Sequence, residues 1–379
     1  MEKRAGGGQI GIKQKRGSFN QVKSLLQKGT VEGVFPGAVL LVAGRGEILF
    51  SEGAGFLSLI PEKLPMKTET IFDLASLTKP LATTLAIMKL ADQGKINIDQ
   101  PLKTLLPEPL PDEKKAITPR LLLCHSAGLI DWKPFYLSLE RHDPVRSKAL
   151  LRKQIMETPL HYASGQGDLY SDLGFMILEW VIEEVTGMTL PRYLDEHFFG
   201  PLLLKTTFFN QGNKPPRYSE DRFAATEECP WRKKVIRGIV HDENAYAVGG
   251  YSGHAGLFGT AQEVYAIVNL LREHYLGNRS DFFNPETVRA FFKRQKVLSE
   301  STWALGWDTP SPEGSSAGRY FSEQSVGHLG FTGTSIWMDL ERDVQVILLT
   351  NRIHPTRNNV KIRAFRPKMH DAIMEAIIH

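Results

Sequence analysis

The sequence predicts an α/β fold in which strands near both ends of the chain form one domain and a mostly helical domain lies between them. Strand patterns occur at residues 38–43 and 47–52, around a Gly-Arg-Gly turn. Helical periodicity and long loops dominate the middle of the chain, and a hairpin pattern returns at residues 335–350. Strands at both ends with helices between them imply one α/β domain made from both termini.

The domain boundaries follow from this alternation. Residues 1–17 are predicted to be a flexible basic arm, residues 18–80 and 249–379 the α/β domain, and residues 81–248 the mostly helical domain. A length of 379 residues with 42% hydrophobic residues can bury a large core and fits about two domains. We expect an active site at the junction of the two domains.

Individual helices are placed by periodicity and by start and stop signals. Thr118-Pro119 marks a helix start, because threonine caps helices and proline is favoured at the first helical position. Gly187 closes an apolar helix, because glycine tolerates the left-handed conformation found there. Further helices are predicted at residues 20–29, 76–94, 261–274 and 359–378, with strands from about residue 304 onward.

Ser76-Leu77-Thr78-Lys79 places a hydroxyl and an amine one helical turn apart. Residues at i and i+3 share a helix face, so the Lys79 amine can reach the Ser76 oxygen. Pro80 is tolerated only where a helix begins, which puts Ser76 at a helix N-terminus, where backbone N–H groups favour negative charge on oxygen. An isolated motif of this kind is usually an ordinary helix start, so the prediction of a serine nucleophile with a lysine base needs further groups.

Tyr170-Ser171-Asp172 lies at the junction between a loop and the helix that Gly187 closes. A phenol at this position can relay protons if a neighbouring cation lowers its pKa, and Lys79 is the cation that we nominate. The alternative is that Tyr170 packs in the core while Ser171 or Asp172 caps the helix; we expect Asp172 to cap it in either case.

Gly327-His328-Leu329-Gly330-Phe331-Thr332-Gly333 opens the hairpin at residues 335–350. Glycines in a strand often mark a place where a ligand approaches the backbone closely, as an active-site edge strand requires. The structural alternative is a bulged edge strand with an incidental histidine.

Taken together, in this order, the three motifs Ser-x-x-Lys, Tyr-Ser-Asp and His-x-Gly resemble those of the class C β-lactamase-like serine hydrolases. This family includes class C β-lactamases, DD-peptidases and related esterases, and the resemblance runs from about Phe35 to the C-terminus. It implies a β-lactamase/transpeptidase-like fold with an antiparallel sheet flanked by helices, and neither a cofactor nor a metal. It also implies catalytic roles for Ser76, Lys79, Tyr170 and His328, and an oxyanion hole made by the N–H groups of Ser76 and Phe331.

Two positions depart from the lactamase pattern. Asp172 replaces an asparagine that helps to hold the substrate amide, and His328 replaces a lysine that helps to anchor the substrate carboxylate. A mostly neutral imidazole weakens the case for a substrate with an essential carboxylate. The departures therefore favour ester hydrolysis over efficient β-lactam hydrolysis.

The mechanism predicted from these residues is two-step acyl transfer to Ser76, with either Lys79 or Tyr170 as the base. Residues predicted to contact a small-molecule ester or amide substrate are Asp172, Leu329, Gly330, Trp132 and Trp307. We expect a carboxylesterase-like serine hydrolase. The alternatives are a β-lactamase or D-amino-acid peptidase, and an inactive homologue that binds a ligand or partner.

Several residues outside the motifs have more ordinary interpretations. His241, Asp242 and His254 could hold a metal, but histidines in glycine-rich loops more often belong to structural hydrogen-bond networks, and we predict no metal. His125 follows a leucine-rich segment and is expected to be a core histidine. Cys124 and Cys229 are expected to be buried, reduced thiols.

Charge and hydropathy exclude two other classes of function. The net charge is +4 and the basic N-terminal arm lacks interleaved aromatic residues, so we expect no nucleic-acid partner. No apolar run is long enough for a membrane span or a secretory signal, so a cytoplasmic protein is expected. The sequence carries no signal for an oligomeric state.

Overall fold

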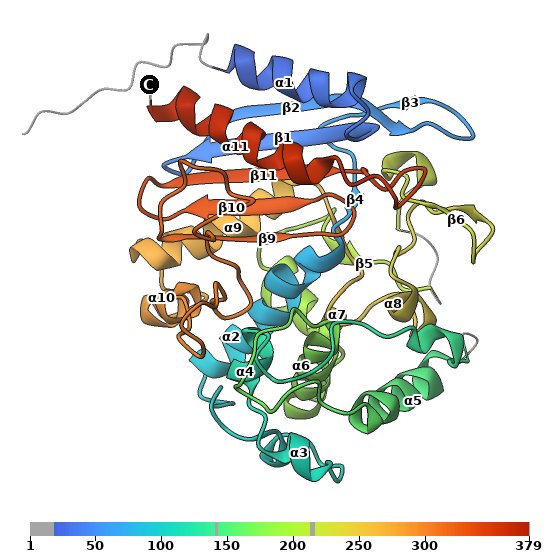
Figure 1. Cartoon of the computed structure of the whole chain (residues 1–379), viewed down its shortest axis with the longest axis vertical. Helices are drawn as coiled ribbons and strands as arrows, with labels where there is room; N and C mark the ends of the chain where they lie inside the picture. Colours follow the sequence, from blue (N-terminus) through green and yellow to red (C-terminus); the bar gives the residue numbers. More distant parts are fainter. Residues whose placement is uncertain (1–18, 141–142, 213–216, 379) are drawn as a thin grey trace, which may run out of the picture.

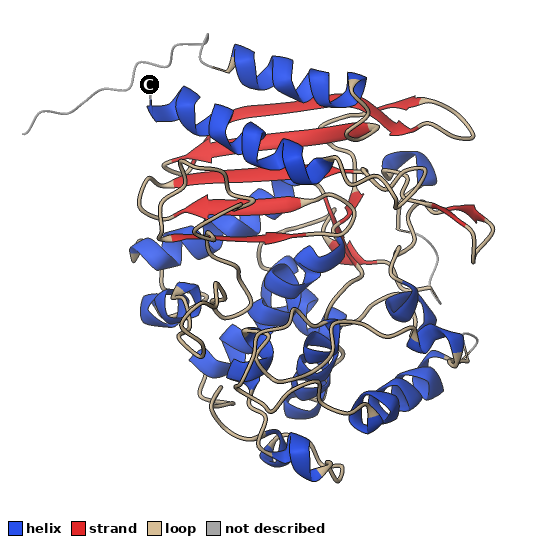
Figure 2. Ribbon diagram, viewed as in Figure 1, coloured by secondary structure: helices blue, strands red, loops and turns tan. Residues whose placement is uncertain are grey.

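The computed structural model describes residues 19–140, 143–212 and 217–378, so the predicted basic arm at residues 1–17 lies outside the described residues. Its main feature is an antiparallel six-stranded sheet with the order β3-β2-β1-β11-β10-β9. Figures 1 and 2 show this sheet as one layer with helices on both sides and a helix-rich region beyond β9. The strands are β1 (Gly37–Gly44), β2 (Glu47–Ser58), β3 (Leu64–Pro65), β9 (Ser325–Leu329), β10 (Ser335–Asp339) and β11 (Val344–Thr350).

Strand β1 lies at the centre of this sheet and is buried on both faces. Ala38, Leu40 and Val42 face a core formed with α1 (Asn20–Val31) and α11 (Ile362–Ile378). Val39 and Leu41 point the other way, into the larger core that includes α9 (Ala261–Leu276). Because successive side chains of a strand alternate between faces, a strand covered on both sides needs an unbroken apolar run, which β1 has.

The pairing of β1 with β11 joins the two ends of the chain. Ala38 lies opposite Thr350 and Gly44 opposite Val344 in an antiparallel register. Figure 1 shows α1 and α11, which lie next to the two ends of the chain, side by side over the same face of the sheet. The predicted α/β fold with an antiparallel sheet from both ends is thereby confirmed, while the division into domains stays a prediction.

The helix-rich region below the sheet carries most of the middle of the chain (Figure 1). Its helices are α2 (Leu85–Asp92), α3 (Asp112–Lys115), α4 (Pro119–Leu123), α5 (Pro144–Glu157), α6 (Asp172–Thr186), α7 (Leu190–Leu194), α8 (Glu243–Ala247) and α10 (Pro285–Phe292). Short strands form two further small sheets: β4 (Phe72–Asp73), β8 (Leu257–Gly259) and β5 (Phe208–Phe209) form one, and β6 (Glu228–Cys229) pairs with β7 (Lys234–Val235) in the other.

Most predicted elements are confirmed within a few residues. The hairpin strands β10 and β11 have the predicted bounds, and Thr118 caps α4 by accepting a hydrogen bond from the Leu121 N–H. Two predictions were wrong. The helix expected at residues 76–94 divides into a 3₁₀ turn at Ala75–Leu77, a π-helix at Lys79–Thr84 and the α-helix α2. The strands expected from residue 304 begin only at Ser325.

Two smaller expectations can also be compared with the structure. Cys124 and Cys229 are buried free thiols, and burial raises the pKa of Cys124 to about 11. Across the described ranges no helix is both long and apolar enough to cross a membrane. The cytoplasmic location stays a prediction.

Candidate active site

Ser76 follows a short strand and a strained turn that hold it at the edge of the helix-rich region. Asp73 at the end of β4 accepts a hydrogen bond from the Ala75 N–H at 2.9 Å, and Ala75 has a positive φ of 48°. Such a conformation is costly for a residue with a Cβ and persists only where its surroundings enforce it. Ser76 is partly exposed, whereas the residues on either side of it in β4, the 3₁₀ turn and the π-helix are buried. This is the placement that a nucleophile needs.

Lys79 is fully buried and lies next to Ser76, as the i and i+3 spacing predicted. Its Nζ donates to Ser76 Oγ at 3.1 Å, to Asp172 Oδ1 at 2.6 Å and to the carbonyl of His254 at 3.3 Å. These three acceptors match the three N–H donors of an ammonium group, whereas a neutral amine would supply only two. The geometry therefore describes a charged lysine in the resting site.

The electrostatics agree with this assignment. Burial disfavours the charged form of Lys79, but the carboxylate of Asp172 and the phenol of Tyr170 together outweigh it, so the pKa of Lys79 is raised above its usual value. Lys79, one of the two predicted bases, is therefore charged in the resting site. An amine that acts as a base here must first give up a proton.

Asp172 was predicted to bind the substrate directly, but its carboxylate faces Lys79. The N-cap of α6 is Ser171, whose Oγ accepts from the Gly174 N–H at 3.4 Å, so the prediction that Asp172 caps this helix was wrong. Because Ser171 takes the cap position, the carboxylate of Asp172 is free to pair with Lys79. Its side chain is 16% exposed, so the pair lies at the boundary between the core and the site.

Tyr170 lies beside the same lysine. The Nζ of Lys79 is 4.7 Å from the centre of the Tyr170 ring. Burial raises the pKa of Tyr170 against the opposing effect of Lys79, so this pKa is not lowered as the sequence interpretation required. The phenol is neutral at physiological pH and can donate a proton.

The His328 strand is fixed to the segment that precedes Ser76. Thr332 Oγ1 donates to the Asp73 carbonyl at 2.9 Å and Thr334 Oγ1 donates to the Leu74 carbonyl at 3.1 Å. A Cβ on Gly330 would lie 2.7 Å from the Leu74 carbonyl, so glycine is needed for this close approach. The expected close approach is thus made by the protein's own backbone next to Ser76.

His328 is buried and neutral. Its Nδ1 lies 2.9 Å from the carbonyl of Leu329, which makes Nδ1 the protonated nitrogen and leaves Nε2 an acceptor without a partner among the described residues. Burial lowers the pKa of His328 to about 3, with Lys79 contributing. His328 therefore offers an acceptor instead of a positive charge.

The predicted oxyanion loop is held by arginines from outside the site. The carbonyl of Phe331 accepts from Arg352 Nε at 2.9 Å, and the carbonyl of Gly333 accepts from Arg366 at 3.2 Å. The carbonyl of Gly330, in the same peptide as the Phe331 N–H, accepts from the Gly333 N–H at 3.0 Å. These bonds fix the orientation of the Phe331 N–H, whose role in an oxyanion hole stays a prediction.

His125 is a site residue that the sequence interpretation assigned to the core. It is buried, with a positive φ of 56°, and its ring centre lies 4.6 Å from that of Tyr170. Its Nδ1 accepts from the Ser171 N–H at 3.0 Å, so the proton lies on Nε2, which is buried without a described partner. Burial lowers the pKa of His125 well below its usual value.

The tryptophan that lies against the site is Trp303, whereas Trp307 had been predicted to contact the substrate. Trp307 is fully buried and packs on Phe292, so its predicted substrate contact is not supported. Trp303 instead lies against the site, with its ring centre 4.4 Å from that of His125 and 5.8 Å from that of Tyr170. Trp132 is 40% exposed and follows Asp131, whose carbonyl accepts from the Asp172 N–H at 2.9 Å.

One group of potential metal ligands exists in the part of the chain that the structure describes. One ligand atom each from Asp172, Asp242 and His254 lie within 4.8 Å of one another. Asp172 is already paired with Lys79, and His254 Nε2 lies 2.9 Å from Asp242 Oδ1. The group is thus occupied by ionic partners from the protein itself.

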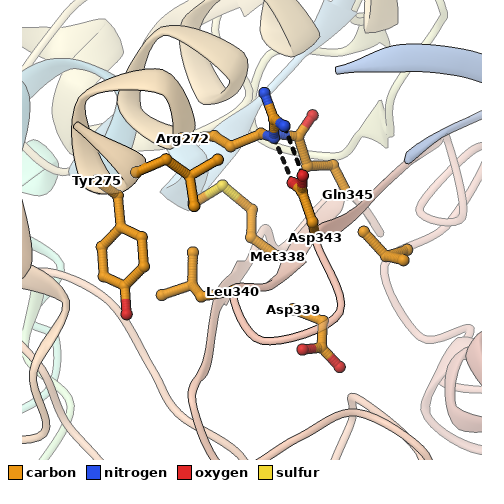
Figure 3. A pocket seen from close by; sticks show the side chains of 9 residues that line it. Arg272, Tyr275, Met338, Asp339, Leu340, Asp343 and Gln345 are labelled. Atoms are coloured by element: carbon orange, nitrogen blue, oxygen red, sulfur yellow. Dashed lines mark hydrogen bonds and ion pairs between the residues drawn. The ribbon is translucent and has the colours of Figure 1, made fainter. Parts of the chain in front are cut away.

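Figure 3 shows a small pocket of about 10 Å³ at the other end of β10 from His328. Arg272 from α9 pairs there with Asp343, and Tyr275, Met338 and Leu340 complete the wall. None of the predicted site residues lines it, and its volume is about that of one water molecule. This pocket is therefore separate from the candidate site around Ser76.

The chain is similar to known proteins along most of its length. Residues 22–366 match the model of the protein family described as Beta-lactamase. The chain is 31% identical over 365 residues to an N-acetylmuramyl-L-alanine amidase of Bacillus subtilis (strain 168), covering 89% of this chain and 81% of the amidase. It is 30% identical over 358 residues to a putative D-alanyl-D-alanine carboxypeptidase of Salmonella agona (strain SL483), covering 88% of this chain and 82% of that protein.

A solved structure shows the same fold. EstCE1, described as a hydrolase with promiscuous acyltransferase activity, superposes with a TM-score of 0.68 and 23% identity, covering 93% of this chain and 99% of EstCE1.

Proposed function

Because this chain belongs to the beta-lactamase family and is a serine hydrolase, we propose that it cleaves a small ester through an acyl-enzyme on Ser76. The observation that carries the proposal is the pair of Ser76 Oγ and Lys79 Nζ, 3.1 Å apart, on the one partly exposed residue of a buried segment. The amide bond is the alternative scissile group within the same chemistry.

Acylation begins with the ion pair of Lys79 and Asp172. Transfer of a proton from Lys79 Nζ to Asp172 Oδ1, 2.6 Å away, leaves a neutral amine beside Ser76. This amine takes the Ser76 proton while Oγ attacks the substrate carbonyl, and the carbonyl oxygen becomes an oxyanion. The N–H groups of Ser76 and Phe331 stabilise that oxyanion.

Tyr170 completes the two half-reactions. Its neutral phenol donates a proton to the leaving alkoxide as the carbon–oxygen bond breaks, and the Lys79 ammonium then returns a proton to the phenolate. In the second half-reaction water gives a proton to the amine and attacks the acyl carbon. The Ser76 oxygen then takes a proton from Lys79 as its bond to the acyl carbon breaks. Asp172 returns its proton to the Lys79 amine, which restores the resting ion pair.

The preference for an ester without a nearby carboxylate follows from the charges. Lys79 is already paired with Asp172, and His328 is a neutral acceptor where lactamases place a lysine. A carboxylate next to the scissile bond would therefore meet no free cation among these site residues. An uncharged ester needs no cation there, so it does not carry the cost of an unpaired charge.

An amide substrate is favoured by a separate observation. Two of the relatives that are at least 30% identical are named as an amidase and as a putative carboxypeptidase, and both names describe cleavage of C–N bonds. The same Ser76 acyl-enzyme serves either bond, and Tyr170 would then protonate an amine instead of an alkoxide.

The test compares wild type with Ser76→Ala on p-nitrophenyl acetate, p-nitrophenyl butyrate and nitrocefin, with acyl adducts followed by intact-protein mass spectrometry. We expect ester turnover in the wild type and a loss of at least about 10⁴-fold in kcat in the variant. Ser138→Ala, which removes an exposed serine hydroxyl, is the matched control and should retain full turnover. Rapid nitrocefin turnover would favour a lactamase, and no acylation of Ser76 by any substrate would favour a binding protein.

A further inference from the structure

A largely buried array of four ionisable side chains extends from Lys79 away from Ser76. Asp172 pairs with Lys79, and His254 Nε2 lies 2.9 Å from Asp242 Oδ1. One oxygen of each aspartate and one ring nitrogen of His254 lie within 4.8 Å of one another. The ion pair of the proposed base and the His254–Asp242 pair are therefore neighbours in one low-dielectric region.

We propose that His254, held by Asp242, is a positioning residue whose charge decides whether Asp172 can take a proton from Lys79. This inference rests on the proposed function, because it concerns the step that frees the Lys79 amine. His254 does not touch the reacting atoms of the substrate and acts through Asp172.

The backbone around His254 is fixed from several elements. Thr83 Oγ1 in the π-helix donates to the Gly253 carbonyl at 2.6 Å, and Glu179 in α6 accepts from the Gly253 N–H at 2.9 Å. A Cβ on Gly253 would lie 2.1 Å from the Phe175 carbonyl, so this close approach requires glycine. With the His254 carbonyl bonded to Lys79 as well, the imidazole has little freedom to leave the array.

The opposite side of the array is equally fixed. Asp242 is the N-cap of α8, and its Oδ1 accepts from the Ala245 N–H at 2.7 Å as well as facing His254. Asp242 is strongly held in the ionised form, with its pKa lowered by His254 and by that N–H against the effect of burial. His254 therefore faces the permanent negative charge of Asp242 on one side and also lies close to Asp172.

Counting charges gives two states of the array. With His254 protonated there are two carboxylates and two cations, and the array is neutral. With His254 neutral there is one excess negative charge, which makes Asp172 a stronger base and favours proton transfer from Lys79. Burial opposes the charged imidazole, but Asp242 and Asp172 outweigh it, so the pKa of His254 is raised above its usual value.

Other charges near His254 are compensated or distant. Lys79 opposes its protonation, and Glu179, whose carboxylate binds the preceding residue's N–H, is paired with Lys148. His241, next to Asp242 in the chain, bonds through its ring to Glu227. His125 and His328, the other site imidazoles, are neutral throughout the physiological range. An acid limb in activity above pH 6.5 would thus belong to His254 and its partners.

The same array accounts for the aspartate that stands where lactamases carry asparagine. An asparagine cannot accept the Lys79 proton, whereas Asp172 can. The added carboxylate brings a buried negative charge, and His254 supplies the cation that balances it in the resting site.

The first experiment does not need an active enzyme. NMR of the full chain with ¹³C-labelled histidine rings follows each imidazole with pH, and the His254 signal is the one missing from His254→Gln. We expect a midpoint above 6.5 in wild type that falls by at least one pH unit in Asp172→Asn and in Asp242→Asn. A wild-type midpoint at or below 6.5, or one that Asp172→Asn leaves unchanged, overturns the inference.

The second experiment measures kcat/KM for p-nitrophenyl acetate between pH 5 and 9. Wild type should lose activity below the His254 midpoint, and His254→Gln should move this acid limb at least one unit lower. We express kcat/KM at each pH as a fraction of the plateau value of the same protein. At a pH below both midpoints, this fraction should be about tenfold larger in the variant than in wild type. Asp242→Asn should move the limb in the same direction, and it replaces His254→Gln if that variant does not fold. An unchanged limb in a folded variant overturns the inference, whereas absence of turnover in wild type overturns the proposed function and leaves the NMR test intact.

Discussion

The candidate site has two halves in which the pKa of histidine is shifted in opposite directions. In the ionic half, Lys79, Asp172, His254 and Asp242 form the buried array, and the pKa of His254 is raised. In the neutral half, Tyr170, His125, His328 and Trp303 pack ring against ring, and burial lowers the pKa of both histidines. The histidines of both halves are buried, so burial alone does not set the charge of a histidine. A carboxylate beside the ring makes the difference.

This difference separates two tasks. The ionic half can hold and pass a proton next to Ser76, since each charge has a partner. The neutral half offers one N–H, on His125 Nε2, and one lone pair, on His328 Nε2, both buried without partners in the described chain. Such groups can bind uncharged polar atoms without the desolvation cost that a charged group carries.

The largest expected effect comes from breaking the ionic half at Lys79. Lys79→Met should lower kcat by about 10³-fold or more, because the base is lost. It should also lower the free energy of unfolding by about 3 kcal/mol, because Asp172 keeps its charge without a partner. Ester turnover and urea unfolding measure the two effects, with the exposed Lys153→Met as control.

The double variant Lys79→Met with Asp172→Asn separates the two effects. It should recover most of the lost stability, because the unpaired carboxylate is gone, but none of the activity. Equal stability of the single and double variants would contradict the ion-pair assignment.

The next effect concerns stability against pH and compares one histidine from each half. His328 binds its proton only near pH 3 when folded but near 6.5 when unfolded, so its contribution falls as the pH drops below 6.5. Between pH 6.5 and 5 this amounts to about 2 kcal/mol. His254 has the opposite sign, because its raised pKa adds stability that is present below 6.5 and lost as pH rises through the folded value.

Urea unfolding at pH 5, 7 and 9 checks both signs. His328→Gln should flatten the loss of stability toward pH 5, and His254→Gln should steepen it. The same pH dependence in wild type and both variants would show that the two halves do not differ in charge as described.

The smallest effect distinguishes two tryptophans. Trp303→Phe should lower kcat/KM by about threefold to tenfold, because ring contacts with His125 and Tyr170 are weakened at the site. Trp307→Phe should leave kcat/KM unchanged and lower the free energy of unfolding by about 1–2 kcal/mol, because it opens a cavity beside Phe292. Steady-state kinetics and thermal unfolding of the two variants test this. Equal kinetic effects would mean that Trp307 contributes to the site after all.

Sequence spacing predicted the contact between Ser76 and Lys79. Contacts between residues far apart in the sequence determine the rest of the candidate site. Ser76 and Lys79 could be joined from sequence because i and i+3 residues share a helix face, and the structure confirms their contact. The array with His254 and Asp242 could not, because those residues come from irregular segments more than 150 positions beyond Lys79. No periodicity relates such segments, so their side chains were interpreted as members of a structural hydrogen-bond network, with no link to Lys79.

The same contrast applies to the fold. Strands β10 and β11 alternate and pack regularly, and their predicted bounds are confirmed. The helix at Ser76 was predicted as continuous, but the chain forms a 3₁₀ turn and a π-helix there, where Lys79 is bonded to three different elements. Propensity cannot foresee a helix that is distorted by its tertiary partners.

The pairing of β1 with β11 has a consequence for how the protein is made. As the chain leaves the ribosome, β1 emerges early, but its neighbour β11 follows about three hundred residues later. Ser76 and Lys79 are likewise present long before His328 and the Phe331 loop arrive. A nascent or truncated chain that ends before β9 therefore holds Ser76 and Lys79 without the strand and the loop that complete the candidate site.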